Sequence, residues 1–268
     1  MKFSKFHGSG NDFIIIDDLQ KKFPCDNVEL IQRLCHRQFG IGADGLILVQ
    51  HSSAADYKMK IFNSDGLEAL MCGNGLRCLT LYLCLKHNQN NFIIESLTGI
   101  HICCNHLCNE EGSCISTSLR TPLIKELSKK LEGGNCVHII DTGVPHAVMF
   151  VEDLQEEGFI ERSRKIRFHK AFSPEGVNVN FACLGKEREI FIRTYERGVE
   201  DETLACGTGA AAAAVAAKCV YGMKSPIEIV VKSKEKLFCY LEEMEGEISK
   251  IYLLGQAQYV FDGNVEVS

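Results

Sequence analysis

The sequence predicts an α+β fold of two similar lobes, each a curved antiparallel sheet around one central helix. A Cys-Gly-polar-Gly unit occurs twice, in Met71–Gly75 (MCGNG) and in Ala205–Gly209 (ACGTG), 134 residues apart in a chain of 268. Each copy follows a strand-like run and opens a helix-like one. The connections between most strand-like runs are short, and short connections favour antiparallel pairing because parallel neighbours need crossovers of a dozen or more residues.

The first half contains two predicted helices. Asp26 and Glu29 have capping-box spacing ahead of a periodic helix that should reach about His36. A second helix is expected at Leu76–Lys86, directly after the first Cys-Gly unit. Alternating or apolar runs predict strands at Ile14–Asp17, Leu46–Val49, Lys58–Phe62, Phe92–Glu95, His101–Cys104 and Cys114–Ser118.

The second half repeats this plan. The polar stretch Thr121–Asn135 is the best candidate linker, so the lobes are expected at 1–119 and 120–268, with the last strand free to return to the first lobe. Ala210–Tyr221 predicts a helix that is small and apolar on nearly every side, and such a helix should be wrapped closely by other elements. Strands are expected at Val137–Asp141, Ala147–Val151, Asn178–Phe181, Glu189–Tyr195, Ile227–Val231, Leu237–Leu241 and Ile248–Leu254.

Composition excludes several classes of partner. Hydrophobic residues make up 46% and charged residues 24%, as in a globular protein. The net charge of −6 argues against a nucleic-acid or anionic-membrane partner, and there is no apolar run of about 18 residues. The N-terminal residues lack the apolar stretch of a signal peptide, so the 14 cysteines are expected to be reduced thiols of a cytoplasmic enzyme. No nucleotide or phosphate fingerprint is present, and no cofactor is expected.

The two Cys-Gly units carry the chemistry. A thiol at a helix N-terminus lies beside unpaired backbone N–H groups and the positive end of the helix dipole, which favour the reactive thiolate. The adjoining glycines allow backbone amides to approach a carboxylate. If the lobes face each other across a cleft, a bound α-amino acid has its α-carbon between two sulfurs, one acting as base and the other as acid. That arrangement predicts racemisation or epimerisation without a cofactor.

The remaining cysteines are interpreted as small buried residues, including Cys35, Cys78, Cys84 and Cys219. One cluster has residue types that suit zinc: His101, Cys103, Cys104, His106, Cys108 and Cys114. It lacks a second pair at zinc-site spacing, and strand alternation sends Cys103 and Cys104 to opposite faces. No metal site is therefore expected.

Several spaced blocks make the chain resemble the diaminopimelate epimerases. The blocks run nearly end to end: KFHGSGNDFIIID (5–17), RQFGIGADGLILV (37–49), FNSDG (62–66), MCGNGLRC (71–78), DTGVPHAV (141–148), NVNF (178–181) and YERGVEDETLACGTGA (195–210). The resemblance implies a cofactor-independent enzyme that interconverts LL- and meso-diaminopimelate for lysine and peptidoglycan synthesis. It also implies a homodimer with a small amino-acid substrate.

The resemblance carries roles to individual residues. It makes Cys72 and Cys206 the two proton-transfer cysteines, and His146 a histidine that supports one of them. It also implies that nine residues contact the substrate: Asn11, Asn63, Gly73, Asn74, Asn178, Glu196, Arg197, Gly207 and Thr208. From the residues alone, Asn11 and Asn63 would be turn residues. The Glu-Arg pair would be an exposed charged pair, and the histidine a surface or hydrogen-bonded one.

Three departures from the family pattern bear on the substrate. Val144 replaces the usual asparagine before Pro-His, Gly45 lies where some members have a polar side chain, and the segment Gly198–Glu202 is one residue longer than usual. A polar group that would be left unpaired by a shorter substrate is thereby lost, which predicts relaxed specificity, with racemisation of an acidic amino acid such as glutamate as the alternative function.

Three rival classes remain. A cysteine nucleophile with His146 as base leaves the second Cys-Gly unit unexplained. A thiol redox protein lacks a Cys-x-x-Cys motif. A non-catalytic carboxylate-binding module would keep ligand binding when either cysteine becomes serine.

Overall fold

The computed structural model describes residues 1–107, 113–155 and 157–266. The chain divides into two compact units, one made of Met1–Ser118 with Gly255–Ser268 and the other of Leu119–Leu254. We call them unit 1 and unit 2. In the part of the chain that the structure describes, no helix is both long and apolar enough to cross a membrane.

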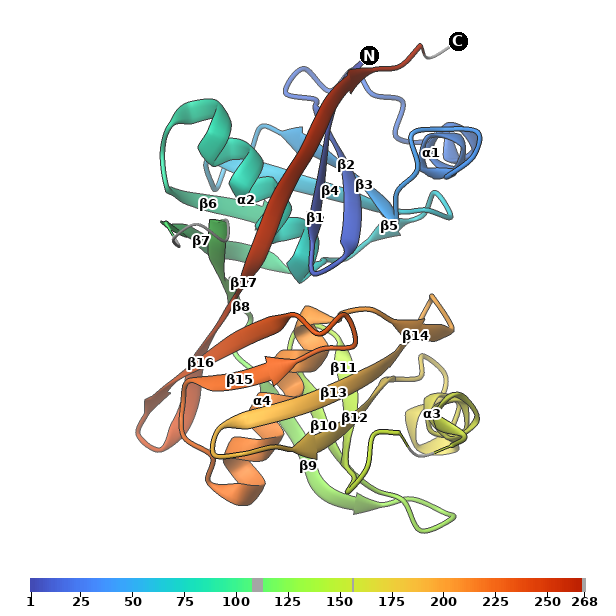
Figure 1. Ribbon diagram of the computed structural model, residues 1–268, viewed down its shortest axis with the longest axis vertical. Coiled ribbons are helices and arrows are strands. Elements are labelled where there is room, and N and C mark those ends of the chain that lie inside the picture. The colour runs from blue at the N-terminus through green and yellow to red at the C-terminus, as the bar shows by residue number, and fades with distance from the viewer. Residues whose placement is uncertain (108–112, 156, 267–268) are drawn as a thin grey trace. The chain divides into compact units, whose positions relative to one another are not determined.

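Unit 1 contains two helices, the first eight strands of Figure 1 and the C-terminal part of β17 (Glu247–Asn264). Its helices are α1 (Val28–Cys35) and α2 (Gly73–His87). Its strands are β1 (Lys2–Gly8), β2 (Asn11–Asp17), β3 (Gly45–Gln50), β4 (Tyr57–Asn63), β5 (Glu68–Ala69), β6 (Asn91–Ser96), β7 (Gly99–Leu107) and β8 (Ser113–Leu119).

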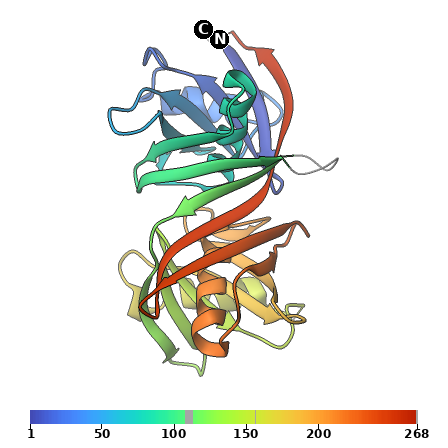
Figure 2. The same cartoon turned by 90° about the vertical axis from the view of Figure 1, so that its left-hand side faces the viewer.

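Unit 2 repeats the element order of unit 1 almost completely. Its helices are α3 (Phe159–Arg167), α4 (Gly207–Tyr221) and the short 3₁₀ turn Lys170–Phe172. Its strands are β9 (Leu123–Lys130), β10 (Cys136–Asp141), β11 (Pro145–Phe150), β12 (Asn178–Leu184), β13 (Glu189–Glu196), β14 (Asp201–Thr203), β15 (Ile227–Val230), β16 (Lys236–Met244) and the first part of β17 (Glu247–Asn264), whose residues from Gly255 on belong to unit 1. The long strand β17, red in Figure 2, pairs first with β16 and then with β1.

Each unit is a mixed sheet rather than the wholly antiparallel one that the short connections predict. Four strand pairs are parallel: β2–β3, β4–β6, β11–β12 and β13–β15. Each parallel pair is joined through one of the four helices, α1 to α4 in that order, which supplies the crossover that parallel pairing requires. The α+β class and the two pseudo-symmetric lobes are confirmed.

Burial on both faces explains the continuous apolar runs of unit 1. In β2, Phe13 and Ile15 pack in the core cluster of α2, while Ile14 and Ile16 pack in that of α1. A strand covered on both faces has no polar side, so its sequence lacks the alternation of a half-exposed strand.

The helix of small residues in unit 2 is wrapped as predicted. Ala210 to Ala217 are fully buried, and α4 contacts β10 to β13, β15 and β16. The cluster around α3 lies on the opposite side of the same strands, because Ala147, Val179 and Phe181 belong to it. The face of β11 and β12 that carries His146 and Asn180 is therefore the α4 face.

Three further expectations are corrected, and one helix was missed. The predicted linker is largely the strand β9, whose mostly exposed residues, rich in lysine, are typical of an edge and give no core signal. Helix α3 was not predicted, because its N-cap Gly158 provides no side-chain cap. The cap of α1 is Asn27, which accepts from Leu30 N at 3.0 Å, rather than Asp26. Cys219 is exposed rather than buried.

Candidate active site

Cys72 is the N-cap residue of α2. Its extended backbone (φ −138°, ψ 119°) ends the segment after β5, and Gly75 N donates to its Sγ at 3.5 Å. Gly73 and Asn74 form the first turn of the helix. The thiol therefore lies at the positive end of a 15-residue helix, as the sequence predicts.

Two side-chain amides lie beside this sulfur. The Cys72 thiol donates to Asn11 Oδ1 at 3.6 Å, and Asn74 Nδ2 donates to the same oxygen at 3.2 Å. Asn11 is the first residue of β2, directly after the turn in which Ser9 (φ 56°) and Gly10 (φ 82°) adopt left-handed conformations. The structure thus brings together three of the predicted site residues of unit 1.

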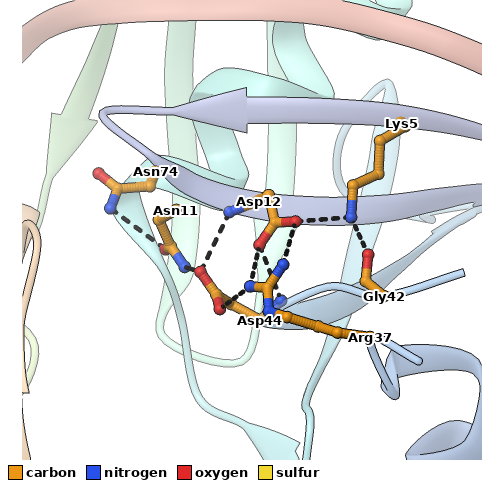
Figure 3. A network of polar contacts seen from close by, with 7 residues as sticks. All are labelled: Lys5, Asn11, Asp12, Arg37, Gly42, Asp44 and Asn74. Carbon is orange, nitrogen blue, oxygen red and sulfur yellow. Dashed lines mark hydrogen bonds and ion pairs between the residues drawn. The ribbon is translucent and has the colours of Figure 1, made fainter.

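Charged residues hold both amides in one orientation. Arg77, fully buried in α2, donates to Asn74 Oδ1 at 2.7 Å and to Ser9 Oγ at 3.3 Å. At the other end, Asn11 Nδ2 donates to Asp44 Oδ2 at 2.8 Å (Figure 3). Arg77 and Asp44 were not predicted as site residues, although each lies inside a block that carries the resemblance.

Asp44 belongs to a network of two carboxylates and two cationic side chains, which holds it in place (Figure 3). Arg37 bridges Asp44 at 2.6 Å and Asp12 at 2.8 Å, and Lys5 pairs with Asp12 at 2.7 Å. Burial acts to raise the pKa of Asp12, but hydrogen bonds from Arg37 and Lys5 prevail and hold it well below its usual range. Asp12 therefore stays ionised, and the network keeps its geometry at neutral pH.

Cys206 is the corresponding N-cap residue of α4. It is 8% exposed, and its Sγ lies 3.5 Å from Thr208 Oγ1. The hydroxyl of Thr142, in the loop between β10 and β11, donates to the Thr208 carbonyl at 2.9 Å. Gly207 and Thr208 form the first turn of the helix. This second thiol thus repeats the placement of Cys72.

His146 lies on the α4 face of β11 and is fully buried. Its Nδ1 lies 3.0 Å from Asn180 Nδ2, and Thr194 Oγ1 donates to Asn180 Oδ1 at 3.0 Å. Burial, reinforced by the positive charge of Arg197, lowers the pKa of His146 to about 3. The imidazole is therefore neutral at physiological pH and does not serve as a cation.

The last glycine of the second Cys-Gly unit allows α4 to approach this group. A Cβ on Gly209 would lie 2.3 Å from Asn180 Oδ1 and 3.4 Å from Cys206 Sγ. In unit 1 a Cβ on the corresponding Gly75 would lie 3.0 and 3.1 Å from the methyl ends of Ile61 and Ile47. Asn180 thus belongs to the Cys206 region. Asn180 lies two residues after Asn178 on one strand, so both side chains are on the same face of the sheet. That spacing is the sequence signal that could have identified Asn180 as a site residue.

The other predicted residues of unit 2 surround the loop after β13. Asn178 Oδ1 accepts from Arg197 N at 2.8 Å, and its Nδ2 donates to Pro145 O at 3.1 Å. Burial raises the pKa of Glu196. The same loop is tied to the unit by Glu200, which accepts from buried Arg167 at 2.9 Å.

Asn63 and Gly45 are partners across the paired strands β4 and β3. Asn63 ends β4, and its backbone N–H donates to Leu67 O in the turn that follows. A Cβ on Gly45 would lie 2.6 Å from Phe62 O, so packing in the sheet requires glycine there. The substrate argument therefore rests on Val144 and not on Gly45.

Among the described residues, the cysteine and histidine cluster contains no group of three side chains placed to hold a metal ion. Cys103 is buried and Cys104 is partly exposed, while His101 and His106 contact Ser96 and Ser116. Cys108 lies outside the described residues. Burial raises the pKa of the Cys103 thiol, and of the Cys35 and Cys239 thiols outside the cluster, to about 12, which keeps these cysteines protonated and unreactive.

Comparisons with known proteins show the family of the chain. The family model described as diaminopimelate epimerase matches residues 3–111 and 138–260. The chain is 38% identical to a diaminopimelate epimerase of Flavobacterium psychrophilum, over 99% of this chain and 100% of that protein. It is also 38% identical to a diaminopimelate epimerase of Aquifex aeolicus, over 99% and 98%.

Solved structures show the same fold at low sequence identity. A hydroxyproline epimerase from Agrobacterium vitis superimposes with a TM-score of 0.76 at 16% identity, over 99% of this chain and 90% of that one. A PhzF-family phenazine biosynthesis protein of Bacillus anthracis has a TM-score of 0.76 at 15% identity, over 100% and 99%. The chain belongs to the diaminopimelate epimerase family.

Proposed function

We propose that the protein interconverts LL- and meso-diaminopimelate by proton transfer between Cys72, Cys206 and one α-carbon. Membership of the family makes the chain an isomerase of the epimerase class. The observation that carries the mechanism is the repeated placement of a cysteine as N-cap of a long helix, once in each unit.

The proposed reaction needs only protein groups. One cysteine, as thiolate, takes the α-proton, and the electron pair left on carbon is delocalised into the α-carboxylate. The other cysteine, as thiol, returns a proton to the opposite face and becomes the thiolate, so the roles exchange in the reverse direction. Backbone N–H groups of the first turns at Gly73–Asn74 and Gly207–Thr208 hold the carboxylate and stabilise its developing charge.

The remaining predicted residues select the substrate. We propose that Asn11, Asn63 and Asn178, with Glu196 and Arg197, bind the amino groups and the distal end. The resemblance further leads us to propose that the enzyme is a cytoplasmic homodimer, and sedimentation of the purified chain tests that assembly.

Incubation with LL-diaminopimelate in D₂O tests the function. We expect deuterium at the α-carbon together with meso product, and loss of epimerisation by several orders of magnitude in Cys72→Ala and in Cys206→Ala. Cys219→Ala removes an exposed thiol from the far end of α4 and serves as the matched control. Epimerisation that survives either active-site substitution would refute the mechanism.

Mild oxidation tests whether the two thiols share one cleft. If they do, oxidation should join Cys72 to Cys206 and stop activity, and dithiothreitol should restore it. Peptide mapping identifies the bridge among the 14 cysteines. Inactivation that persists after reduction, or a bridge elsewhere, would count against a shared cleft.

A further inference from the structure

A row of three polar side chains crosses the sheet beneath the first turn of α4. His146 on β11, Asn180 on β12 and Thr194 on β13 are 0%, 0% and 4% exposed. Asn180 and Thr194 are cross-strand partners, and Asn178, two residues before Asn180 in β12, is the partner of His146. Buried polar groups require defined hydrogen bonds, so the direction of each bond in this row is informative.

The bond directions fix the protonation of the imidazole. Thr194 Oγ1 donates to Asn180 Oδ1 at 3.0 Å, so the amide nitrogen faces His146 Nδ1, also at 3.0 Å. An amide nitrogen only donates, and His146 Nδ1 must therefore be the acceptor. In a neutral imidazole the proton is then on Nε2. The low pKa of His146 agrees with a ring that carries one proton.

The protonated nitrogen, His146 Nε2, is buried and makes no hydrogen bond to any of the described residues. Its surroundings are groups already placed at the proposed substrate site. Arg197 is close enough to act on its charge, Asn178 contacts the neighbouring Pro145, and Asn180 lies against the first turn of α4 near Cys206.

We propose that Asn180 is a positioning residue that holds His146 as the Nε2–H tautomer, whose N–H donates to an oxygen of the bound substrate beside Cys206. This inference rests on the proposed function. It assigns a role to a residue that does not itself touch the substrate. It also assigns His146 the role of a neutral donor, so the ring takes no proton during the reaction.

Nitrogen NMR of protein labelled with ¹⁵N-histidine measures the tautomer directly. The chain has nine histidines, and His146→Gln identifies the resonances of this one. We expect wild-type His146 to have an acceptor-type Nδ1 and a protonated Nε2. An equilibrium mixture of LL- and meso-diaminopimelate should shift the Nε2–H signal and slow its exchange with water.

Asn180→Asp is the informative substitution because an ionised carboxylate of the same shape only accepts. We expect the proton to appear on Nδ1 and kcat to fall by about 10²–10³-fold, as when a single preorganised donor is lost. Ser163→Ala is the matched control, since it removes a fully buried hydroxyl from α3, on the other side of the sheet. It should leave both the tautomer and kcat unchanged.

Thr194→Val provides a second variant if the aspartate prevents folding. Without the hydroxyl the Asn180 amide can turn over, so a mixture of tautomers and a smaller loss of kcat are expected. A wild-type His146 protonated on Nδ1 would overturn the inference, as would a changed tautomer with unchanged kcat. A wild type that is inactive on diaminopimelate but has the Nε2–H tautomer would instead refute the proposed function.

Discussion

Arg77 and Asp44 lie at the two ends of a hydrogen-bonded chain that orients both side-chain amides beside Cys72. The chain runs from Arg77 to Asn74 at 2.7 Å, from Asn74 to Asn11 at 3.2 Å and from Asn11 to Asp44 at 2.8 Å. A cation at the donor end and an anion at the acceptor end give both amides the same polarity. As a result, Asn11 presents its carbonyl oxygen to the thiol.

Replacing Asp44 by alanine should release this orientation. Asn11 could then turn its amide nitrogen toward Cys72, and we expect kcat/KM for diaminopimelate to fall by roughly tenfold, which corresponds to about 1–2 kcal/mol for one lost hydrogen bond to a charged group. Steady-state kinetics measures the effect. Glu95→Gln is the control because it weakens another ion pair of unit 1, with Lys58 at 3.0 Å. Equal losses in both variants would mean that Asp44 has no specific role.

Alanine at Gly209 should be much more harmful than alanine at Gly75, although the two positions are equivalent in the repeated unit. The new methyl would meet the Asn180 carboxamide at 2.3 Å, whereas at Gly75 it would meet two flexible isoleucine ends at 3.0 Å or more. We expect Gly209→Ala to lower the free energy of unfolding by about 2–3 kcal/mol and Gly75→Ala by about 1 kcal/mol.

A double-mutant cycle checks the cause. If the Asn180 contact is responsible, adding Asn180→Ala to Gly209→Ala should recover part of the lost free energy, measured by urea denaturation. Additive losses would place the strain elsewhere in the first turn of α4.

The repeated Cys-Gly units predicted much of the fold, because a local signal marks each long helix at its N-cap. The edge strand β9 and the uncapped helix α3 were missed, since neither contains a buried periodic face or a capping residue strong enough to identify it. Strand direction was also missed. The direction of strand pairing depends on which two strands each helix connects, and short-range sequence patterns do not encode that connection.

From the residues alone, the only site residues that could be predicted were those in a short local motif. Cys72 and Asn74 occur together in one motif, and their contact with Asn11 follows from a resemblance rather than from spacing. Asn180 and Asp44 act through partners that are distant in sequence, 34 residues for Asn180 and His146 and 33 for Asp44 and Asn11, whereas Arg77 acts on Asn74 three residues away through a buried contact. Their roles became visible only when burial and hydrogen-bond direction were known.

The buried His146 should make the protein less stable in acid. Its pKa is about 3 in the folded state and near 6.5 when unfolded, so between these pH values only the unfolded chain binds the proton. The free energy of unfolding should therefore fall as the pH is lowered from 6.5 toward 3, with a slope of up to about 1.4 kcal/mol per pH unit from this residue.

Urea denaturation at pH 4.5 to 6.5 measures that slope. Asp12, whose pKa is also lowered, contributes in the same direction but mainly below pH 4. His146→Gln should therefore have a shallower dependence on pH than the wild type over this range, whatever its absolute stability. Parallel curves would show that His146 is not the group responsible.

Val144 offers a test of substrate range. It is partly exposed in the loop between β10 and β11, two residues from His146 and two from Thr142, whose hydroxyl holds the Cys206 turn. We expect the wild type to racemise glutamate slowly, because no side-chain amide at this position would be left unpaired by a substrate without a second amino-acid end.

Val144→Asn should raise the preference for diaminopimelate over glutamate by roughly tenfold, the value of one hydrogen bond of about 1.5 kcal/mol. Val144→Ala, which changes volume without adding an amide, should leave the ratio of kcat/KM values unchanged. A wild type with no turnover of single-ended amino acids would exclude relaxed specificity and leave diaminopimelate as the sole substrate.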